Sequence, residues 1–139
     1  MKVVAIIPAR AGSFRLPKKN RRKLLGIPLI DWSINFVKKL KFVDDIIVST
    51  DDKIIINNIK KNQKLVKTII RPQILSGKTA KMEDVIIHAL KKYEKRFGRI
   101  GTILLLQPTS PIRSVKKIYY GYKKYNFYKK RKSIISVSN

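Results

Sequence analysis

The 139-residue chain contains no cysteine, one histidine and only eight acidic residues. Without cysteine, a disulfide framework and a thiolate metal site are both excluded. The single histidine, His88, has no second imidazole beside it, so we interpret it as a packed or half-exposed helix residue, with general-base chemistry as the alternative. No apolar run approaches the roughly 20 residues that span a bilayer, and the short N-terminal run meets Pro8 and Arg10 too early for a signal peptide. We therefore expect a cytoplasmic protein that has no contact with a membrane.

The few acids are outnumbered by 33 lysines and arginines, which gives a formal net charge of +25. Such an excess is typical of proteins that bind nucleic acid or another polyanion. The basic residues are nevertheless spread over all the predicted helices and accompanied by many isoleucines and asparagines, as an A/T-rich genome would also produce. We therefore expect non-specific polyanion binding and keep a nucleic-acid-binding α/β protein as an alternative function.

Apolar runs alternate with helical patterns along the chain. Runs rich in β-branched residues predict buried strands at residues 3–7, 45–50, 65–70, 102–106 and 133–137. Amphipathic spacing predicts helices at residues 28–40, 53–63, 81–97 and 115–127. The alternation predicts an α/β protein of three layers, in which a doubly wound, mostly parallel sheet has helices on both faces.

Polar loops follow two of these strands, at residues 8–20 and 107–113. In a doubly wound sheet, ligands bind at the carboxyl ends of the central strands. The first loop is cationic and bears Gly12, which suits phosphates, although it is neither a P-loop nor a dinucleotide-binding motif. The second contains Gln107, which can read a base or sugar edge through its paired donor and acceptor. We expect the first and fourth strands to be neighbours, which would bring both loops to one site.

Three other features allow two readings each. We interpret the adjacent acids Asp51 and Asp52 as helix caps, with metal binding as the alternative. We interpret Trp32 as a core residue, with base stacking as the alternative. The tyrosines and lysines of residues 119–128 predict a partly buried face under extended lysine side chains, and a surface for single-stranded nucleic acid is the alternative.

The order of residues resembles one enzyme family. The matching runs are A-R-A-G-S-x-R-L-P-x-K-N (9–20), L-G-I-P-L-I (25–30), I-V-S-T-D (47–51), R-P-x-x-L (71–75) and L-L-Q-P-T-S-P-x-R (105–113). They resemble the acylneuraminate cytidylyltransferases, which activate sialic acids and related nine-carbon acids as CMP-sugars. The resemblance covers residues 3–137 and implies a Rossmann-like nucleotidyltransferase fold. It also implies the reaction, in which a hydroxyl of the sugar acid attacks the α-phosphate of CTP and expels pyrophosphate with the help of Mg²⁺.

The resemblance assigns roles residue by residue. Lys19 and Arg10 fall on catalytic positions, where Lys19 stabilises the charged phosphates. The nucleotide-binding positions fall on Arg10, Ala11, Gly12, Ser13, Arg15, Lys19, Asn20 and Arg71. The substrate-binding positions fall on Gln107, Thr109 and Ser110. From the residues alone, Arg71 could equally be a surface arginine in a turn.

The chain departs from the family pattern at four positions. Phe14 replaces a lysine, Lys18 stands where glycine is common, Lys78 stands where an acid is usual, and Met82 replaces a residue that is often small and polar. Family members also continue beyond this length, into a part that supplies dimer contacts and the aspartates that hold Mg²⁺. No Mg²⁺ ligand can therefore be assigned in this sequence.

These observations predict a single nucleotide-binding α/β domain at residues 1–139 that lacks the C-terminal part of the family. We expect its partners to be CTP and a nonulosonic acid such as N-acetylneuraminate, its cofactor to be Mg²⁺, and the complete protein to be a homodimer. A catalytically weak or inactive nucleotide-binding remnant is an alternative, beside the polyanion-binding protein.

Overall fold

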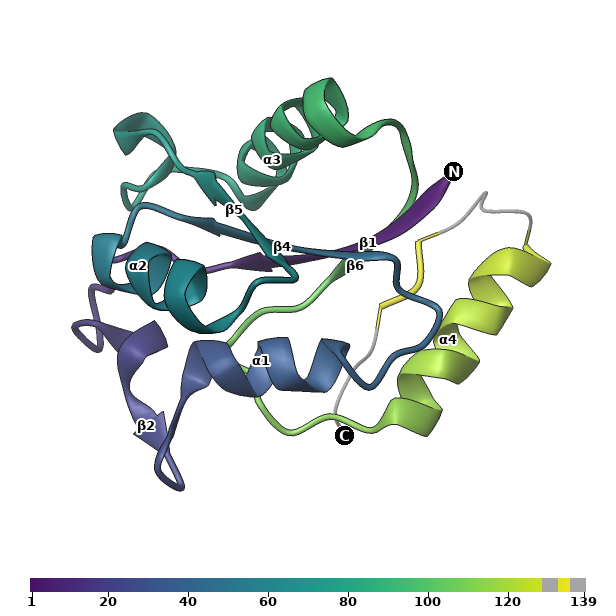
Figure 1. The fold of residues 1–139 in the computed structure, drawn as a ribbon, viewed down its shortest axis with the longest axis horizontal. Helices are drawn as coiled ribbons and strands as arrows, with labels where there is room; N and C mark the ends of the chain where they lie inside the picture. The colour runs from purple at the N-terminus through teal and green to yellow at the C-terminus, as the bar shows by residue number, and fades with distance from the viewer. Residues whose placement is uncertain (129–132, 136–139) are drawn as a thin grey trace.

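The computed structural model describes residues 1–128 and 133–135, and these residues form a four-stranded parallel sheet of order β5-β4-β1-β6 with helices packed around it (Figure 1). The strands are β1 (Lys2–Pro8), β4 (Asp45–Thr50), β5 (Val66–Ile70) and β6 (Ile100–Leu105). The α-helices are α1 (Leu29–Val37), α2 (Lys53–Asn62), α3 (Met82–Phe97) and α4 (Val115–Phe127). Shorter elements are the hairpin β2 (Lys23–Leu24) and β3 (Ile27–Pro28) and the 3₁₀ turns η1 (Lys19–Arg21) and η2 (Gln73–Leu75).

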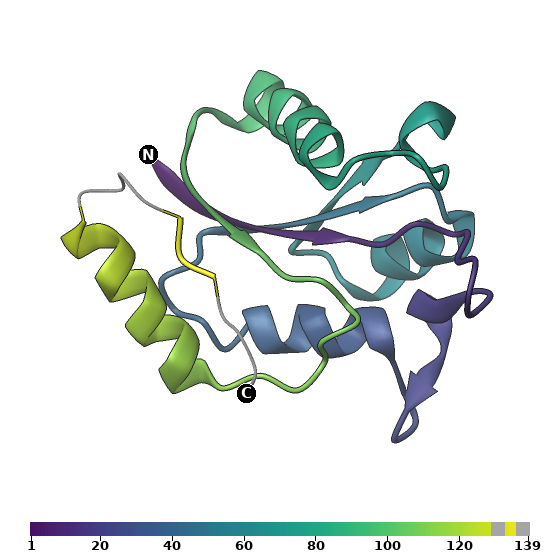
Figure 2. The ribbon, with the colours of Figure 1, turned by 180° about the vertical axis from the view of Figure 1, so that it is seen from behind.

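Helix α3 covers one face of the sheet, and α1 and α2 cover the other (Figures 1 and 2). Strand β1 shows why helices cover both faces of the sheet, because its side chains are apolar on both faces. Val4 and Ile6 pack in the cluster with α3, whereas Ala5 and Ile7 pack in the cluster with α1 and α2, and all four are 0% exposed. Fully burying one such branched side chain contributes about 1.5–3 kcal/mol. The prediction of a three-layer, doubly wound parallel sheet is confirmed.

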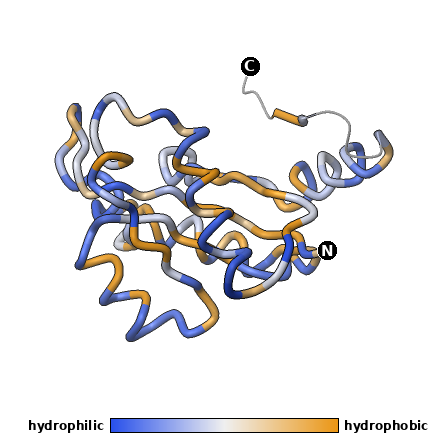
Figure 3. Tube along the Cα trace, turned by 90° about the horizontal axis from the view of Figure 1, so that it is seen from above, coloured by the Kyte–Doolittle hydropathy of each residue, from blue (hydrophilic) through white to orange (hydrophobic). Residues whose placement is uncertain are grey.

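The hydrophobic residues follow the central strands, while hydrophilic residues dominate much of the outer chain (Figure 3). Strands β1 and β6 are neighbours, as the sequence predicts, with Ile6 paired to Leu105. The pairing continues past the strand ends, where the Ala9 amide donates to the Ser49 carbonyl (2.9 Å) and the Leu106 amide to the Ile6 carbonyl (3.0 Å). The loops that leave β1, β4 and β6 therefore begin side by side.

The hairpin β2–β3 was not predicted, and it corrects the reading of Trp32. Leu25 and Gly26 form its turn, with φ angles of 51° and 80°. The indole N–H of Trp32 donates to the Leu24 carbonyl (2.9 Å), so this half-buried ring fastens the hairpin to α1. The prediction that Trp32 is a core residue is wrong, and its neighbour Ser33 is the buried one, at 0% exposed.

Two other predictions differ from the structure at element ends. Helix α1 ends at Val37 rather than at Leu40, although Leu40 is still buried in the core. The predicted strand at 133–137 is not found at residues 133–135, which have no regular structure, and its last two residues lie outside the described part of the chain. Among the described residues, no helix is long and apolar enough to cross a membrane.

Helix α4 packs through one face and exposes another. Ile118 packs against the α1–α2 core, and Tyr122 stacks on Phe42 with ring centroids 4.2 Å apart. The ammonium group of Lys123 lies 5.4 Å from the ring centroid of Tyr119, and that of Lys124 lies 4.9 Å from Tyr120. Tyr119 and Tyr120, the rings beside these lysines, are 48% and 59% exposed, so the partly buried face that the sequence predicts is found at Ile118 and Tyr122 but not at these two rings.

A polar cluster closes the end of the sheet opposite the predicted site. Asp45, the first residue of β4, accepts hydrogen bonds from Lys2 (3.1 Å), Lys67 and Tyr93. Burial raises the pKa of Asp45, but these three hydrogen bonds outweigh burial and hold the pKa at about 2, below its ordinary 3.8. The cluster therefore stabilises the fold in the ionised form of Asp45.

Candidate functional site

A cavity of about 280 Å³ lies where β1, β5 and β6 end. Its described lining includes four cationic side chains and no acidic one. Eight of the eleven predicted site residues line it: Arg10, Gly12, Ser13, Lys19, Asn20, Arg71, Gln107 and Thr109. The other three, Ala11, Arg15 and Ser110, are not part of the lining. Three segments that are distant in sequence thus form one positively charged cavity.

The loop after β1 is held in place by two buried or half-buried polar side chains. The Ala11 amide donates to Asp51 Oδ1 (2.7 Å), and Asn20 Nδ2 donates to the Arg10 carbonyl (3.1 Å). Asn20 is only 7% exposed, so its amide acts within the fold as well as lining the cavity. Both contacts hold the peptide group between Arg10 and Ala11, directly after the residue that carries the Arg10 side chain.

Lys19 opens η1, which follows a left-handed residue. Lys18 has φ 55° and ψ 31°, a conformation that glycine adopts most readily, so the glycine that is common at this position has a structural reason. Arg21, at the other end of η1, donates through Nε to Asp52 Oδ2 (2.8 Å). The backbone that carries Lys19 is therefore anchored on both sides, and its side chain lines the cavity.

The adjacent acids Asp51 and Asp52 have different structural roles. Asp52 caps α2, because its Oδ1 accepts from the amides of Ile54 (2.9 Å) and Ile55 (3.4 Å), as the sequence predicts. Asp51 does not cap the helix. It instead accepts the Ala11 amide and connects the end of β4 to the first loop.

Arg71 lies beneath the cavity and is only 5% exposed, so the reading of it as a surface arginine is wrong. Its Nη2 donates to the Ser49 carbonyl (2.9 Å), while its buried Nε has no hydrogen-bond partner among the described residues. Burial lowers the pKa of Arg71, Asp51 opposes that shift, and Arg10 adds to it. A buried guanidinium with an unpaired donor favours an anion in the adjoining cavity.

The third segment is shaped by Arg113 at the end of the Q-P-T-S-P-I-R run. Arg113 Nη2 donates to the Gln107 carbonyl and Nη1 to Ser33 Oγ (3.1 Å), so this arginine ties the loop to α1. Burial lowers the pKa of Arg113. The contact with Arg113 uses the backbone carbonyl of Gln107. The Gln107 residue lines the cavity and is exposed.

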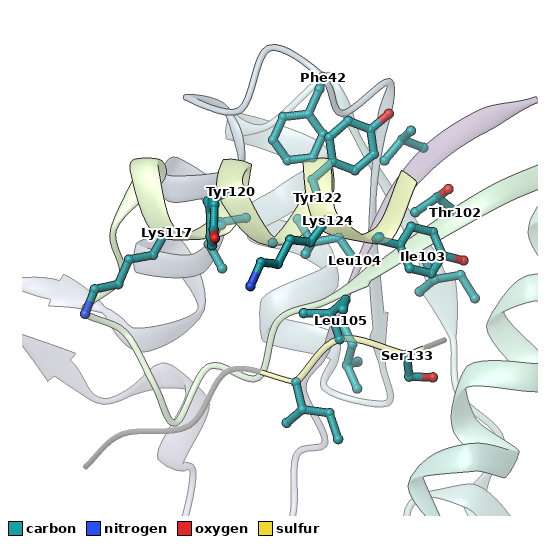
Figure 4. A pocket seen from close by; sticks show the side chains of 16 residues that line it. Phe42, Thr102, Ile103, Leu104, Leu105, Lys117, Tyr120, Tyr122, Lys124 and Ser133 are labelled. Carbon is teal, nitrogen blue, oxygen red and sulfur yellow. The ribbon is translucent and has the colours of Figure 1, made fainter. Parts of the chain in front are cut away.

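A larger hollow of about 580 Å³ lies elsewhere, between β6, α4 and residues 133–135 (Figure 4). Its lining is mostly apolar and aromatic, with Leu104, Leu105, Tyr120 and Tyr122 among the labelled side chains. None of the predicted site residues lines it. The smaller, cationic cavity is therefore the candidate site.

A family model for cytidylyltransferases matches residues 4–135, which includes every segment of the cavity. The chain belongs to the cytidylyltransferase family. It is 36% identical to the CMP-N,N'-diacetyllegionaminic acid synthase of Legionella pneumophila over 99% of this chain and 58% of that protein. It is 32% identical to the N-acylneuraminate cytidylyltransferase of Escherichia coli over 99% of this chain and 31% of that protein. The chain thus spans at most about three-fifths of the length of these two curated relatives.

Two solved structures have the same fold as this chain. A CMP:2-keto-3-deoxy-manno-octonic acid synthetase complexed with CTP superimposes with a TM-score of 0.72 at 21% identity, over 91% of this chain and 48% of that one. A 4-diphosphocytidyl-2C-methyl-D-erythritol synthase superimposes with a TM-score of 0.71 at 12% identity. At such low sequence identities, the similarity establishes the fold of this cytidylyltransferase family member but not its substrate.

The acids near the cavity do not fit the Mg²⁺ that the family implies. Residues 1–128 and 133–135 contain no group of three or more metal-ligating side chains. Asp51 and Asp52, which follow β4, are engaged by Ala11, Arg21 and the first turn of α2. His88 is half-buried on α3, as predicted, and its pKa is lowered by burial and then by Lys92 and Arg71.

Sequence reasoning missed two residues at this site. Asp51 was assigned to the helix cap, and only the tertiary contact with Ala11 reveals its connection to the loop. Lys78 was noted only as a departure from the family pattern, yet it lines the cavity beside Gly77. A lysine next to glycine in a loop that follows a buried strand is the signal that could have identified it.

Proposed function

We propose that this chain is the nucleotide-binding part of a cytidylyltransferase, which transfers CMP from CTP to a nonulosonic acid and releases pyrophosphate. The observation that supports this most is the cavity itself, which has four cationic side chains and no acidic one in its described lining. It lies at the carboxyl ends of a parallel sheet, where α/β proteins bind nucleotides. The unpaired Nε of Arg71 beside it is suited to a phosphate oxygen.

In this proposal, Arg10 and Lys19 stabilise the negative charge that shifts between phosphate oxygens during the transfer. Phosphoryl transfer depends mainly on cations positioned in advance, and removing one such group commonly lowers the rate on the order of 10²–10³-fold. Gly12, Ser13 and Asn20 also line the cavity, and they are proposed contacts to the nucleotide. Ala11 acts through its amide, which Asp51 holds, whereas Arg15 is exposed and is not part of the cavity lining.

The acceptor class is inferred from the relatives. They are named for diacetyllegionaminic acid, N-acylneuraminate and, at 31% identity over 90% of this chain, pseudaminic acid in Campylobacter jejuni. All three are nonulosonic acids, and N-acetylneuraminate is one example. Gln107 and Thr109 line the cavity and are the proposed contacts to substrate, whereas Ser110 shapes the turn by donating its amide to the Gln107 carbonyl (3.1 Å).

A divalent cation would neutralise the phosphates in such a reaction, and the resemblance implies Mg²⁺. Because the described acids near the cavity do not fit one, we assign no ligand and no step to it. The homodimer likewise stays a prediction for the complete protein.

The test is pyrophosphate release by the purified 139-residue chain with CTP, Mg²⁺ and N-acetylneuraminate, legionaminic acid or pseudaminic acid. Release that needs both substrates and falls at least 100-fold in Lys19→Ala supports the proposal. CTP binding without release supports the alternative of a catalytically inactive nucleotide-binding remnant. If the chain neither binds CTP nor releases pyrophosphate, the proposed enzyme and the inactive nucleotide-binding remnant are both excluded.

A second candidate function, polyanion binding, is favoured by α4. Tyr119 and Tyr120 are 48% and 59% exposed and lie beside Lys123 and Lys124. Exposed aromatic rings among lysines can stack with bases and contact the backbone of a single strand. This face is separate from the cationic cavity, so variants distinguish the two functions.

A further inference from the structure

Two loops that are far apart in sequence meet over the rim of the cationic cavity. Arg10 Nη1 donates to the Gly77 carbonyl (3.2 Å). Next to that contact, the Lys78 ammonium group lies 3.3 Å from the ring centroid of Phe14. Residues 10 and 14 belong to the loop after β1, and residues 77 and 78 belong to the loop after β5. The two contacts therefore join the loop after β1 to the loop after β5 at two places.

The contact between Phe14 and Lys78 is a cation–π interaction. An ammonium group over the face of a phenyl ring is attracted to the negative part of its quadrupole. Phe14 is 75% exposed, as several other large apolar side chains of this chain are, so the contact with Lys78 and not the exposure is the informative observation. Phe14 is not part of the cavity lining, whereas Lys78 is. The ring thus contacts the ammonium group of a lysine whose residue lines the cavity.

Lys78 and Phe14 are two of the four positions at which the sequence departs from the family pattern. The loop has an aromatic ring where a lysine is usual, and the opposite loop has a lysine where an acid is usual. The close contact places the Lys78 ammonium group against residue 14, the position at which the resemblance implies a lysine.

We propose that Lys78 is a further phosphate-binding residue of the cavity and that Phe14 is the positioning residue that holds its ammonium group there; this rests on the proposed function of the cavity. Lys78 is the fourth cation of the lining, beside Arg10, Lys19 and Arg71. Lys78 is exposed, whereas Arg71 is buried. A ligand with several phosphates engages Lys78, whereas one with a single phosphate does so less.

The experiment measures binding of CTP, CMP and inorganic tripolyphosphate to the 139-residue chain at one ionic strength. We expect Lys78→Met to weaken CTP and tripolyphosphate binding about 10-fold, as loss of one charge-assisted contact does, and CMP binding less. Lys78→Arg keeps the charge and is expected to retain most of the affinity. Lys64→Met, which removes an exposed lysine in the turn before β5, is the control for net charge.

Phe14 is tested through its coupling to Lys78. Phe14→Leu should weaken CTP binding about 2–5-fold, whereas Phe14→Tyr should keep CTP binding because the ring face is kept. Phe127→Leu is the control at a ring that is 80% exposed on α4, and it should leave CTP binding unchanged. In the Lys78→Met background, Phe14→Leu should cause no further loss, because its effect passes through the lysine.

The outcomes separate this inference from the proposed function. If the unmodified chain binds CTP and Lys78→Met binds CTP and tripolyphosphate as Lys64→Met does, the inference is overturned and the function stands. If the chain does not prefer CTP but Lys78→Met still weakens tripolyphosphate binding, the function fails and the phosphate contact stands. Additive effects of the Phe14 and Lys78 variants would overturn the positioning role.

Discussion

The Asp51 carboxylate accepts a hydrogen bond from the Ala11 amide at 2.7 Å, so the end of β4 holds the loop that leaves β1. The same carboxylate acts electrostatically on Arg71, where it opposes the lowering of the arginine's pKa by burial. One acid therefore stabilises two cationic parts of the cavity without being part of its lining. This explains how a cavity with so many cations is held in shape.

Asp51→Ala should weaken CTP binding about 10-fold, because the loss of a hydrogen bond to a charged group costs about 1.5–3 kcal/mol and here also releases the loop. Asp51→Asn keeps an acceptor and should lose less. Asp44→Ala is the matched control, since Asp44 accepts the Val3 amide, also at 2.7 Å, at the far end of β1. Equal CTP affinity in the Asp51→Ala and Asp44→Ala proteins would contradict the positioning role.

Lys18→Gly should stabilise the chain by roughly 0.5–1 kcal/mol. Lys18 has a left-handed backbone, which costs a residue with a Cβ roughly 1–2 kcal/mol, and the greater freedom of glycine in the unfolded chain offsets part of the gain. Urea unfolding measures the difference. Lys18→Ala removes the same side chain but keeps the Cβ, so a gain of the same size in this variant would contradict the conformational explanation.

Folding stability should fall as the pH drops from about 4 to about 2. The folded-state pKa of Asp45 is about 2, below its ordinary 3.8, so the ionised carboxylate stabilises the fold above that range and the stabilisation is lost on protonation. The difference corresponds to about 2 kcal/mol. Asp45→Asn should be less stable at pH 7 and should lack this part of the pH dependence, as followed by urea unfolding at several pH values. If the stability of Asp45→Asn depended on pH as that of the unmodified chain does, the role of the Asp45 carboxylate would be contradicted.

Salt should separate the two candidate functions. Binding of a single-stranded oligonucleotide through many lysines releases counterions and should weaken steeply between 50 and 200 mM salt, about 10-fold or more. CTP binding in the cavity involves fewer charges and should weaken by only a few fold. Replacing Tyr119 and Tyr120 by alanine should reduce oligonucleotide binding and leave CTP binding unchanged. A loss of CTP binding in that variant would contradict a separate site.

The middle of the sheet could be predicted from the sequence because strands β1 and β4 are buried on both faces. Residues 45–50 are β4 as predicted, since a run of branched apolar residues between polar turns allows few alternatives. The strands of the hairpin β2–β3 have two residues each, too few for any periodicity, and its turn has Leu25 where asparagine or glycine would be typical. Trp32 was misassigned for the same reason, because its partner is a carbonyl of that hairpin.

Eight of the eleven predicted site residues line the cavity, but Lys78 and the contacts within the site were not predicted. Motif order identified Arg10, Lys19 and Gln107, and the topology explains why they converge. The sequence could not distinguish a buried Arg71 from an exposed one, because its burial depends on the Ser49 carbonyl of another strand. The contact between Lys78 and Phe14 was equally invisible, since 64 positions separate the two residues along the chain.

The central claim is that the cationic cavity binds CTP selectively, and an equilibrium titration of the 139-residue chain with CTP and with ATP tests it most directly. The account predicts that CTP binds at least 10-fold more tightly than ATP, as transfer of CMP requires, and that Lys19→Ala weakens CTP binding at least 10-fold, because it removes a cation from the cavity. Equal affinity for both nucleotides, or CTP binding that Lys19→Ala leaves unchanged, would contradict the account.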